Sequence, residues 1–196
     1  MKKTAIALAA FVCLGTGLKA QTIQEGVNHL NADRFKTAIS IFEKLLATNP
    51  NNIEATYWLG QTYFDMDDNA MARQIYDKAL ASNGSAPLIL VGLGHADLLD
   101  NKTSDARQKF ESAITASRTR KGDDPFVSYA IGRANVDAKA GDFNYAIEKL
   151  KIAVDKGEKS AEYFVQLGNA YRKARPGEGG GDAFQSYNKA LEINPN

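Results

Sequence analysis

The chain has 196 residues, of which 44% are apolar, and its 24 lysines and arginines nearly balance its 23 aspartates and glutamates. This composition is typical of a single globular or repeat unit, and it excludes intrinsic disorder and collagen-like structure. A net charge of +1 gives no electrostatic reason to expect a polyanion. We therefore expect no nucleic-acid partner, because that partner requires a clustered basic surface.

The first 20 residues have the pattern of a secretory signal peptide. Lys2 and Lys3 precede an apolar run over residues 5–18, and the small residue Ala20 follows. A membrane-spanning helix needs roughly 20 apolar residues, more than this run contains. We therefore predict a signal peptide at residues 1–20, cleavage before Gln21 and no stable membrane insertion. The junction resembles exported proteins of Gram-negative bacteria, which implies secretion across the inner membrane into the periplasm.

Removal of the signal peptide would change the charge and the redox chemistry of the chain. It takes away three lysines, so that the net charge falls from +1 to −2, and it takes away Cys13, the one cysteine. An exported chain without cysteine has no disulfide to hold it together. Packing alone must then stabilise the fold.

Two series of residues recur after position 20 at spacings of 34 to 40 residues. The first is a series of glycines: Gly26, Gly60, Gly94, Gly132 and Gly168. The second is a series of alanines, each followed four residues later by an aromatic residue or leucine: Ala38, Ala72, Ala106, Ala146 and Ala183. Both series lie in apolar stripes at helical spacing, which indicates five helix pairs. The small residues allow the two helix axes of a pair to approach closely where they cross.

The same spacing predicts ten helices. In chain order they cover residues 22–31, 35–48, 53–66, 69–82, 87–99, 103–117, 125–140, 143–156, 161–174 and 182–193. Turn residues separate them, and Gly141 is expected to adopt a positive φ after a helix end. Two longer segments, 118–124 and 176–182, are expected to be surface loops.

This pattern resembles the tetratricopeptide repeat family, whose 34-residue unit is an antiparallel helix pair. The second repeat carries most of the family signature in Leu59, Gly60, Tyr63, Ala72 and Tyr76. The resemblance implies an all-α fold, a right-handed superhelix (α-solenoid) of five antiparallel helix pairs. The repeats would span about 21–52, 53–86, 87–120, 125–160 and 161–196, so that residues 21–196 form one domain.

Patterns that could indicate chemistry have simpler interpretations here. Asp65, Asp67 and Asn69 alternate like calcium ligands, but Ala70 replaces the glycine that a calcium loop needs. A solvated turn in which Asn69 caps the next helix is favoured. His29 and His95 lie in different repeats, so no catalytic or metal-binding cluster can be assembled from them. We predict no enzyme activity, no metal and no cofactor.

What remains is the concave side of the stack, which is lined by the first helix of each pair. The family resemblance implies that a peptide or protein segment binds there. Helical spacing assigns the following residues to this groove: Tyr57, Gln61, Phe64, Leu88, Val91, His95, Leu98, Phe126, Tyr129, Arg133, Asn169 and Arg172. From these residues the groove is expected to change from apolar to basic along its length. The alternative is that neighbouring helices bury them as ordinary core.

Two functions follow from this surface. The first is an exported scaffold for protein–protein interaction, acting in the assembly of a cell-envelope complex. The second is a binding module for an envelope polymer such as peptidoglycan. A polymer binder should present stacked aromatic rings with amide and carboxylate partners, whereas a protein scaffold should present a mainly apolar groove.

The last residues resemble the end of the first repeat. Residues 194–196 repeat the Asn-Pro-Asn of residues 49–51, after which the chain continues into another helix. Stacked repeats usually finish with a polar capping helix. We therefore expect either further C-terminal repeats or docking of helix 182–193 on another subunit of a larger assembly.

Overall fold

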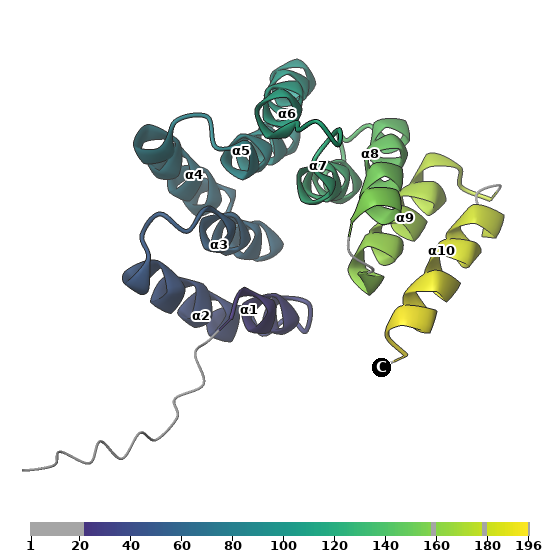
Figure 1. Cartoon of the computed structure of the whole chain (residues 1–196), viewed down its shortest axis with the longest axis horizontal. Coiled ribbons are helices and arrows are strands. Elements are labelled where there is room, and N and C mark those ends of the chain that lie inside the picture. Colours follow the sequence, from purple (N-terminus) through teal and green to yellow (C-terminus); the bar gives the residue numbers. More distant parts are fainter. Residues whose placement is uncertain (1–21, 158–159, 178–179, 196) are drawn as a thin grey trace, which may run out of the picture.

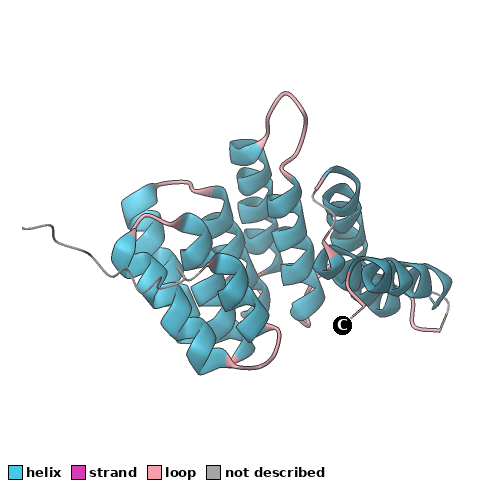
Figure 2. Ribbon diagram, turned by 60° about the horizontal axis from the view of Figure 1, so that its bottom comes forward, coloured by secondary structure: helices cyan, strands magenta, loops and turns pink. Residues whose placement is uncertain are grey.

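The computed structural model describes residues 22–157, 160–177 and 180–195; the predicted signal peptide lies outside the described residues. In these ranges the chain forms ten helices and no strand (Figure 2). The helices are α1 (Ile23–Leu30), α2 (Phe35–Thr48), α3 (Ile53–Asp65), α4 (Asn69–Asn83), α5 (Pro87–Leu99), α6 (Thr103–Ser117), α7 (Pro125–Asp137), α8 (Phe143–Lys156), α9 (Ala161–Ala174) and α10 (Gly180–Ile193). All ten predicted helices are present. None of the described helices is long and apolar enough to cross a membrane.

Consecutive helices form five pairs that stack in chain order. Each second helix also packs against the first helix of the next pair, and the first helices α1, α3, α5, α7 and α9 contact one another in sequence. Figure 1 shows that the stack bends into an arch, with the first and last helix pairs on its open side. The predicted all-α solenoid of helix pairs is therefore confirmed.

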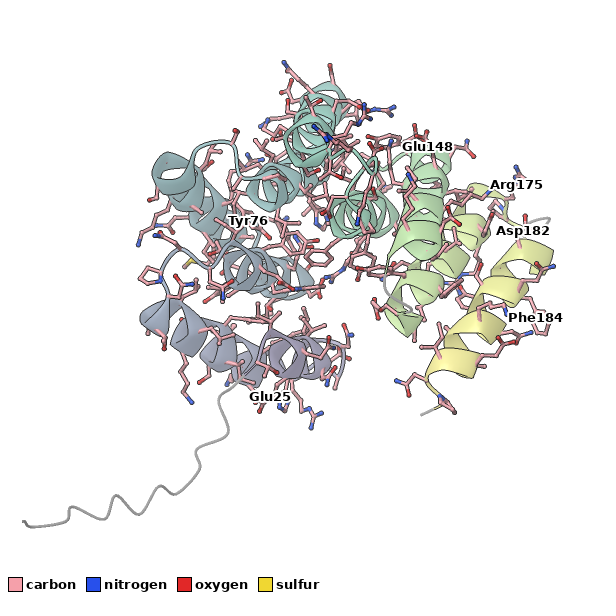
Figure 3. All side chains as sticks on the ribbon, viewed as in Figure 1. Glu25, Tyr76, Glu148, Arg175, Asp182 and Phe184 are labelled. Atoms are coloured by element: carbon pink, nitrogen blue, oxygen red, sulfur yellow. The ribbon has the colours of Figure 1, made fainter. Side chains whose placement is uncertain are left out.

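Glycines of the first helices allow the close packing within each pair. A Cβ atom built on Gly60 would overlap the Tyr76 ring, and one built on Gly26 would lie 2.5 Å from the Phe42 ring. Tyr76 is fully buried between α3, α4 and α5 (Figure 3). The later pairs repeat this arrangement: Gly94 with Phe110, Gly132 with Leu150, and Gly168 with Tyr187. The two recurring series in the sequence are thus the two sides of one contact.

The turn inside each of the first three pairs has one residue with a left-handed backbone. These residues are Asp33, Asp67 and Asn101, with φ of 55°, 59° and 60°, and they stand 34 positions apart. Aspartate and asparagine tolerate this conformation better than most residues other than glycine. The amide after each of them closes the preceding helix, as when Arg34 N donates to His29 O at 2.9 Å.

Side-chain caps fix the starts of five helices. Thr22, Asn52, Asp68, Asp124 and Asp142 each accept a hydrogen bond from the backbone amide three residues further on. Such a cap satisfies an amide that has no partner within the helix. The predicted cap Asn69 is wrong: Asp68 is the cap of α4, accepting from Met71 N at 3.0 Å, and Asn69 is the first helical residue.

The largest difference from the predicted boundaries is at the end of α7, which stops at Asp137 rather than at residue 140. The Asn135 side chain donates to Ile131 O at 2.9 Å and accepts from Asp142 N at 3.0 Å, which brings the turn back against the helix. Gly141 does not have a positive φ, contrary to the prediction. Glycine is needed at this position for lack of space instead, because a Cβ atom on residue 141 would overlap the carbonyl of Asn135.

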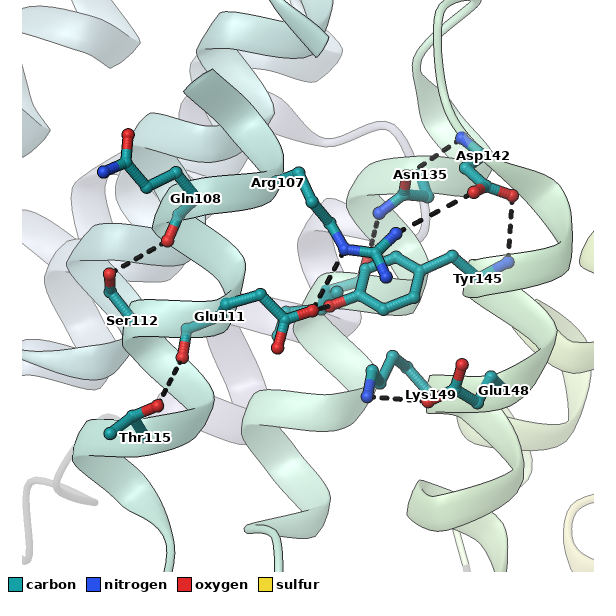
Figure 4. Close-up of polar contacts among 11 residues, drawn as sticks. Arg107, Gln108, Glu111, Ser112, Thr115, Asn135, Asp142, Tyr145, Glu148 and Lys149 are labelled. Carbon is teal, nitrogen blue, oxygen red and sulfur yellow. Dashed lines mark hydrogen bonds and ion pairs between the residues drawn. The ribbon is translucent and has the colours of Figure 1, made fainter. Parts of the chain in front are cut away.

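The third and fourth pairs meet through polar side chains on the side of the second helices. Tyr145 of α8 donates to Glu111 of α6 at 3.0 Å, and Arg107 of α6 lies over the Tyr145 ring at 3.5 Å (Figure 4). Arg107 also pairs with Glu111 at 3.0 Å. These contacts connect α6 directly to α8.

Candidate binding surface

Most of the predicted groove residues lie inside the protein. Nine of the twelve are buried: Tyr57, Gln61, Phe64, Leu88, Val91, His95, Leu98, Tyr129 and Arg133. Phe126 and Asn169 are partly exposed, and Arg172 is exposed. The neighbouring helices cover these nine residues almost completely, so that they offer a partner little accessible surface.

A buried hydrogen-bond chain connects the second and third pairs. The Tyr76 hydroxyl donates to Tyr57 O at 2.7 Å and accepts from Gln61 Nε2 at 2.9 Å. Because the Gln61 amide nitrogen is used in this way, its oxygen accepts from His95 Nδ1, 3.3 Å away. Burial lowers the pKa of His95 to about 3, and the positive charge of Arg133 acts in the same direction. His95 is therefore neutral and serves as a hydrogen-bond donor in the core.

Arg133 forms the charged centre of the inner side. Its Nη2 lies 2.9 Å from Asp65 of α3 and its Nε lies 3.1 Å from Asp137 of α7, while its guanidinium is 5.4 Å from the centre of the Trp58 ring. Burial raises the pKa of both carboxyl groups, and Arg133 partly opposes this. The two carboxylates outnumber the one guanidinium. The expected basic character is therefore wrong at this position, because the charge of Arg133 is used inside the protein.

On the inner side the described residues enclose a cavity of about 630 Å³ between the first and last pairs. We call it the mouth cavity. Its walls come from four first helices and the residues next to them: Ile23, Gln24, Val27 and Asn31 at α1; Glu54 and Trp58 of α3; Pro125, Phe126 and Tyr129 of α7; and Ser160, Glu162 and Tyr163 at α9. A partner can enter this part of the concave side.

Aromatic rings form one continuous wall of the mouth cavity. Phe126 stacks on Tyr129 with ring centres 6.0 Å apart, and Tyr129 stacks on Tyr163 at 4.5 Å. Trp58 lies 6.1 Å from Phe126. Only Phe126 and Tyr163 are partly exposed, since Trp58 and Tyr129 are buried. The outer members of the wall are therefore the rings that a ligand can contact.

Two carboxylates stand at the rim of the mouth cavity. Glu162 accepts from the Tyr129 hydroxyl at 3.3 Å and from Gln166 Nε2 at 3.2 Å, and Asn31 Nδ2 lies at 3.5 Å. Glu54 is exposed; partial burial of its carboxyl raises its pKa, and a hydrogen bond with Trp58 lowers it. Neither carboxylate has a lysine or arginine partner in the described part of the chain.

Sequence reasoning selected only two of the residues around the mouth cavity, Phe126 and Tyr129. Glu54 and Glu162 were missed although each stands six residues before the glycine of its repeat, the same position as Leu88 and Phe126. Extending the predicted stripe to every repeat would have found both. The contact of α1 with α9 across the opening has no sequence signal, because it depends on the curvature of the whole stack.

The other predicted site residues have structural partners or lie elsewhere. Asn169 accepts from the Tyr187 hydroxyl at 2.9 Å within the last pair. Asp65, a member of the rejected calcium pattern, pairs with Arg133. Among the described residues no group of three or more histidine, aspartate or glutamate side chains is arranged to hold a metal ion.

Comparison with known proteins agrees with the architecture. Residues 29–89 match the sequence profile described as tetratricopeptide repeat. A tetratricopeptide repeat protein from Parabacteroides merdae is similar over 88% of this chain and 64% of its own, with a TM-score of 0.60 and 18% identity. A thermophilic protein of this kind from Thermus thermophilus is similar over 88% and 90%, with a TM-score of 0.59 and 22% identity.

A third similar structure is the Cut9–Hcn1 hetero-tetramer of the APC/C, with a TM-score of 0.56 and 19% identity, covering 89% of this chain and 33% of that one. Comparison with curated sequences finds no match. At these identities the likeness concerns the fold alone. The class is thus a helical-repeat solenoid. Over residues 29–89 the chain is similar to the tetratricopeptide repeat.

Proposed function

We propose that this protein is a non-enzymatic scaffold that binds a peptide or protein segment on the concave side of its solenoid. The observation that carries the proposal is the mouth cavity, since it is open while nine of the twelve predicted groove residues are buried. The partner would contact the partly exposed rings of Phe126 and Tyr163 at the rim. Aromatic side chains supply large contact areas at low entropic cost.

The proposed place of action is the periplasm, in the assembly of an envelope complex. The signal pattern of residues 1–20 supports export, and a cysteine-free mature chain is compatible with an oxidising compartment. Expression of the full chain in a Gram-negative host, followed by intact-mass measurement of the periplasmic fraction, should give a protein that begins at Gln21. A product that retains Met1 would contradict export.

Binding itself is tested by selecting 12-residue peptides from a displayed library on the immobilised mature chain. Peptides that use the mouth cavity should bind the wild type and lose affinity for Phe126→Ala and for Ser160→Trp, which fills the entrance. Enrichment of no peptide, or of peptides whose affinity neither variant changes, would overturn the proposal. Phe184→Ala on the outer side of α10 (Figure 3) is the matched control for loss of an exposed ring.

An envelope polymer such as peptidoglycan is the second candidate, because the mouth cavity combines aromatic rings with the amides of Gln24 and Asn31 and two carboxylates. Sugar rings bind best to exposed aromatic faces. The buried Tyr129 ring is stacked between its neighbours and presents none. We therefore rank the protein segment first. A pull-down from envelope extract with and without glycan digestion separates the two, since a polymer binder loses its ligand on digestion.

A further inference from the structure

We propose that the mouth cavity receives a lysine or arginine side chain of the bound segment, so that the preferred partner is a basic peptide. This inference rests on the proposed function and specifies its ligand. It reverses the expectation from the sequence, in which the groove becomes basic along its length.

The charge of the cavity walls is the first argument. Among the residues that line the mouth cavity, Glu54 and Glu162 are charged and no lysine or arginine is present. One carboxylate stands on α3 and the other on α9, at the same position of their respective repeats. A cation between the two helices would therefore face negative charge from both sides. An acidic segment would meet repulsion that no wall residue offsets.

In the part of the chain that the structure describes, the neighbouring core supplies no cation for these carboxylates. Arg133, the nearest buried guanidinium, already pairs with Asp65 and Asp137 and leaves that group with an excess of negative charge. Lys173 donates to Val136 O at 2.5 Å, at the far end of α7. No side chain in the described ranges provides the neutralisation of an ion pair, so we assign that role to a ligand.

Glu162 is held in one orientation before any ligand arrives. The Tyr129 hydroxyl and Gln166 Nε2 both donate to its Oε1, at 3.3 Å and 3.2 Å. Among the described residues its other oxygen, Oε2, has the long contact with Asn31 at 3.5 Å. An oriented carboxylate loses little conformational freedom on binding, which favours an ion pair over the same pair between two mobile side chains.

The walls also suit the shape of a basic side chain. Lysine and arginine carry an aliphatic stem that packs on apolar surface while the charged end reaches a polar rim. The partly exposed side chains of Phe126, Tyr163 and Ile23 in the cavity wall offer that apolar surface. Binding cavities for small ligands have volumes of about 300 to 1,000 Å³. At about 630 Å³ the mouth cavity has room for such a side chain together with the backbone that carries it.

The chain contains its own probe for this site. Trp58 is the one tryptophan in the sequence and lines the mouth cavity. Its fluorescence therefore reports occupancy. The ligands are four versions of one peptide selected as described above, with lysine, arginine, norleucine or glutamate at the central position. Norleucine keeps the stem of lysine and lacks the charge, so that the comparison isolates the ion pair.

We expect the lysine and arginine peptides to change Trp58 fluorescence and to bind about tenfold or more tightly than the norleucine peptide. Glu54→Gln and Glu162→Gln should each reduce this preference, and the double variant should remove it. Raising the ionic strength from about 0.05 M to about 0.5 M should lower the affinity of the lysine peptide and leave the affinity of the norleucine peptide nearly unchanged. Glu25→Gln, an exposed glutamate of α1 outside the cavity lining, is the matched control.

Each result separates the two proposals. Equal affinity of the four peptides, together with a change in Trp58 fluorescence, would overturn the basic-side-chain inference and leave the concave binding function standing. Tighter binding of the glutamate peptide would overturn the inference as well. Binding with no response of Trp58 and no effect of Phe126→Ala would overturn both. Melting temperatures of the glutamine variants, expected to equal that of the wild type, exclude unfolding as the cause of lost affinity.

Discussion

Arg133 of α7 forms an ion pair with Asp65 of α3, with Nη2 and Oδ2 2.9 Å apart although 68 residues separate them in the chain. The two residues belong to the second and fourth helix pairs. In an ordinary solenoid each repeat contacts only its neighbours. Here a buried side chain bypasses the third pair and connects the inner sides of the repeats around it.

Arg133→Met should destabilise the protein strongly. It leaves Asp65 and Asp137 without their cationic partner, and removal of one member of a buried ion pair typically costs about 3 to 5 kcal/mol. Urea denaturation followed by circular dichroism measures the loss. In the double-mutant cycle with Asp65→Asn, the two losses should not add. Additive losses would mean that the pair does not couple the two repeats.

Gly60→Ala should disrupt the second helix pair. The added Cβ would overlap the Tyr76 ring, which is held by hydrogen bonds to Tyr57 and Gln61 and cannot turn away without breaking them. Overpacking of this kind costs about 1 to 3 kcal/mol. Gly181→Ala in α10, where no atom lies within 4 Å, is the control and should leave the free energy of unfolding unchanged or slightly raised. Equal effects of the two substitutions on thermal unfolding would contradict the packing argument.

Substitution of the buried aromatic residues should lower stability, whereas substitution of the aromatic residues at the rim should lower binding affinity. Tyr57→Ala and Tyr129→Ala remove fully buried rings, and we expect each to lower the free energy of unfolding by about 3 to 5 kcal/mol. Phe126→Ala, at the rim, should instead weaken binding of a selected peptide by about 1 to 3 kcal/mol. Denaturation curves and titration calorimetry on the same variants give both quantities. Loss of affinity without loss of stability in Tyr129→Ala would assign that ring to the binding surface.

Acid should destabilise the protein because of His95. Burial lowers its pKa from 6.5 to about 3, so the unfolded chain binds a proton at mildly acidic pH that the folded chain does not. Stability is therefore full above pH 6.5 and falls as the pH decreases toward 3. Asp65 and Asp137, with raised pKa values, oppose this only near their own titration. Between pH 6.5 and about pH 5, His95→Gln should flatten the stability curve measured by urea denaturation.

Helix α10 should be the least protected of the second helices. It packs against α9, and Phe184 and Leu191 on its outer side are 64% and 59% exposed. Hydrogen exchange of the monomer should therefore be faster in α10 than in the second helix α8, which packs against both α7 and α9. Equal protection at low protein concentration would contradict the expectation that this helix docks on further repeats or on another subunit. Protection that increases with concentration would support docking between copies.

The sequence predicted the helices well because helix period, caps and small residues act locally. Gly60 and Tyr76 recur in a fixed relation, and Asp33 and Asp67 mark the turns at the same spacing. The burial of Tyr57 and Arg133 could not be predicted in this way. Whether a concave side stays open depends on small rotations between successive pairs, which add up along the stack and leave no pattern in any single repeat. The acidic rim was accessible to the sequence argument, since Glu162 occupies the same repeat position as Phe126.

The ion pair between Arg133 and Asp65 affects how the solenoid can bend. An open superhelix can stretch and bend, and small movements at every contact between neighbouring repeats share the deformation. Here the ion pair fixes the second and fourth helix pairs to each other. Bending is therefore expected mainly in the first and fifth pairs, which lie on opposite sides of the mouth cavity. In the described residues, the side-chain hydrogen bond that joins them directly is the 3.5 Å contact of Asn31 with Glu162. A ligand that pairs with Glu162 would break this hydrogen bond, and the distance between the first and fifth pairs could then adjust to the size of the ligand.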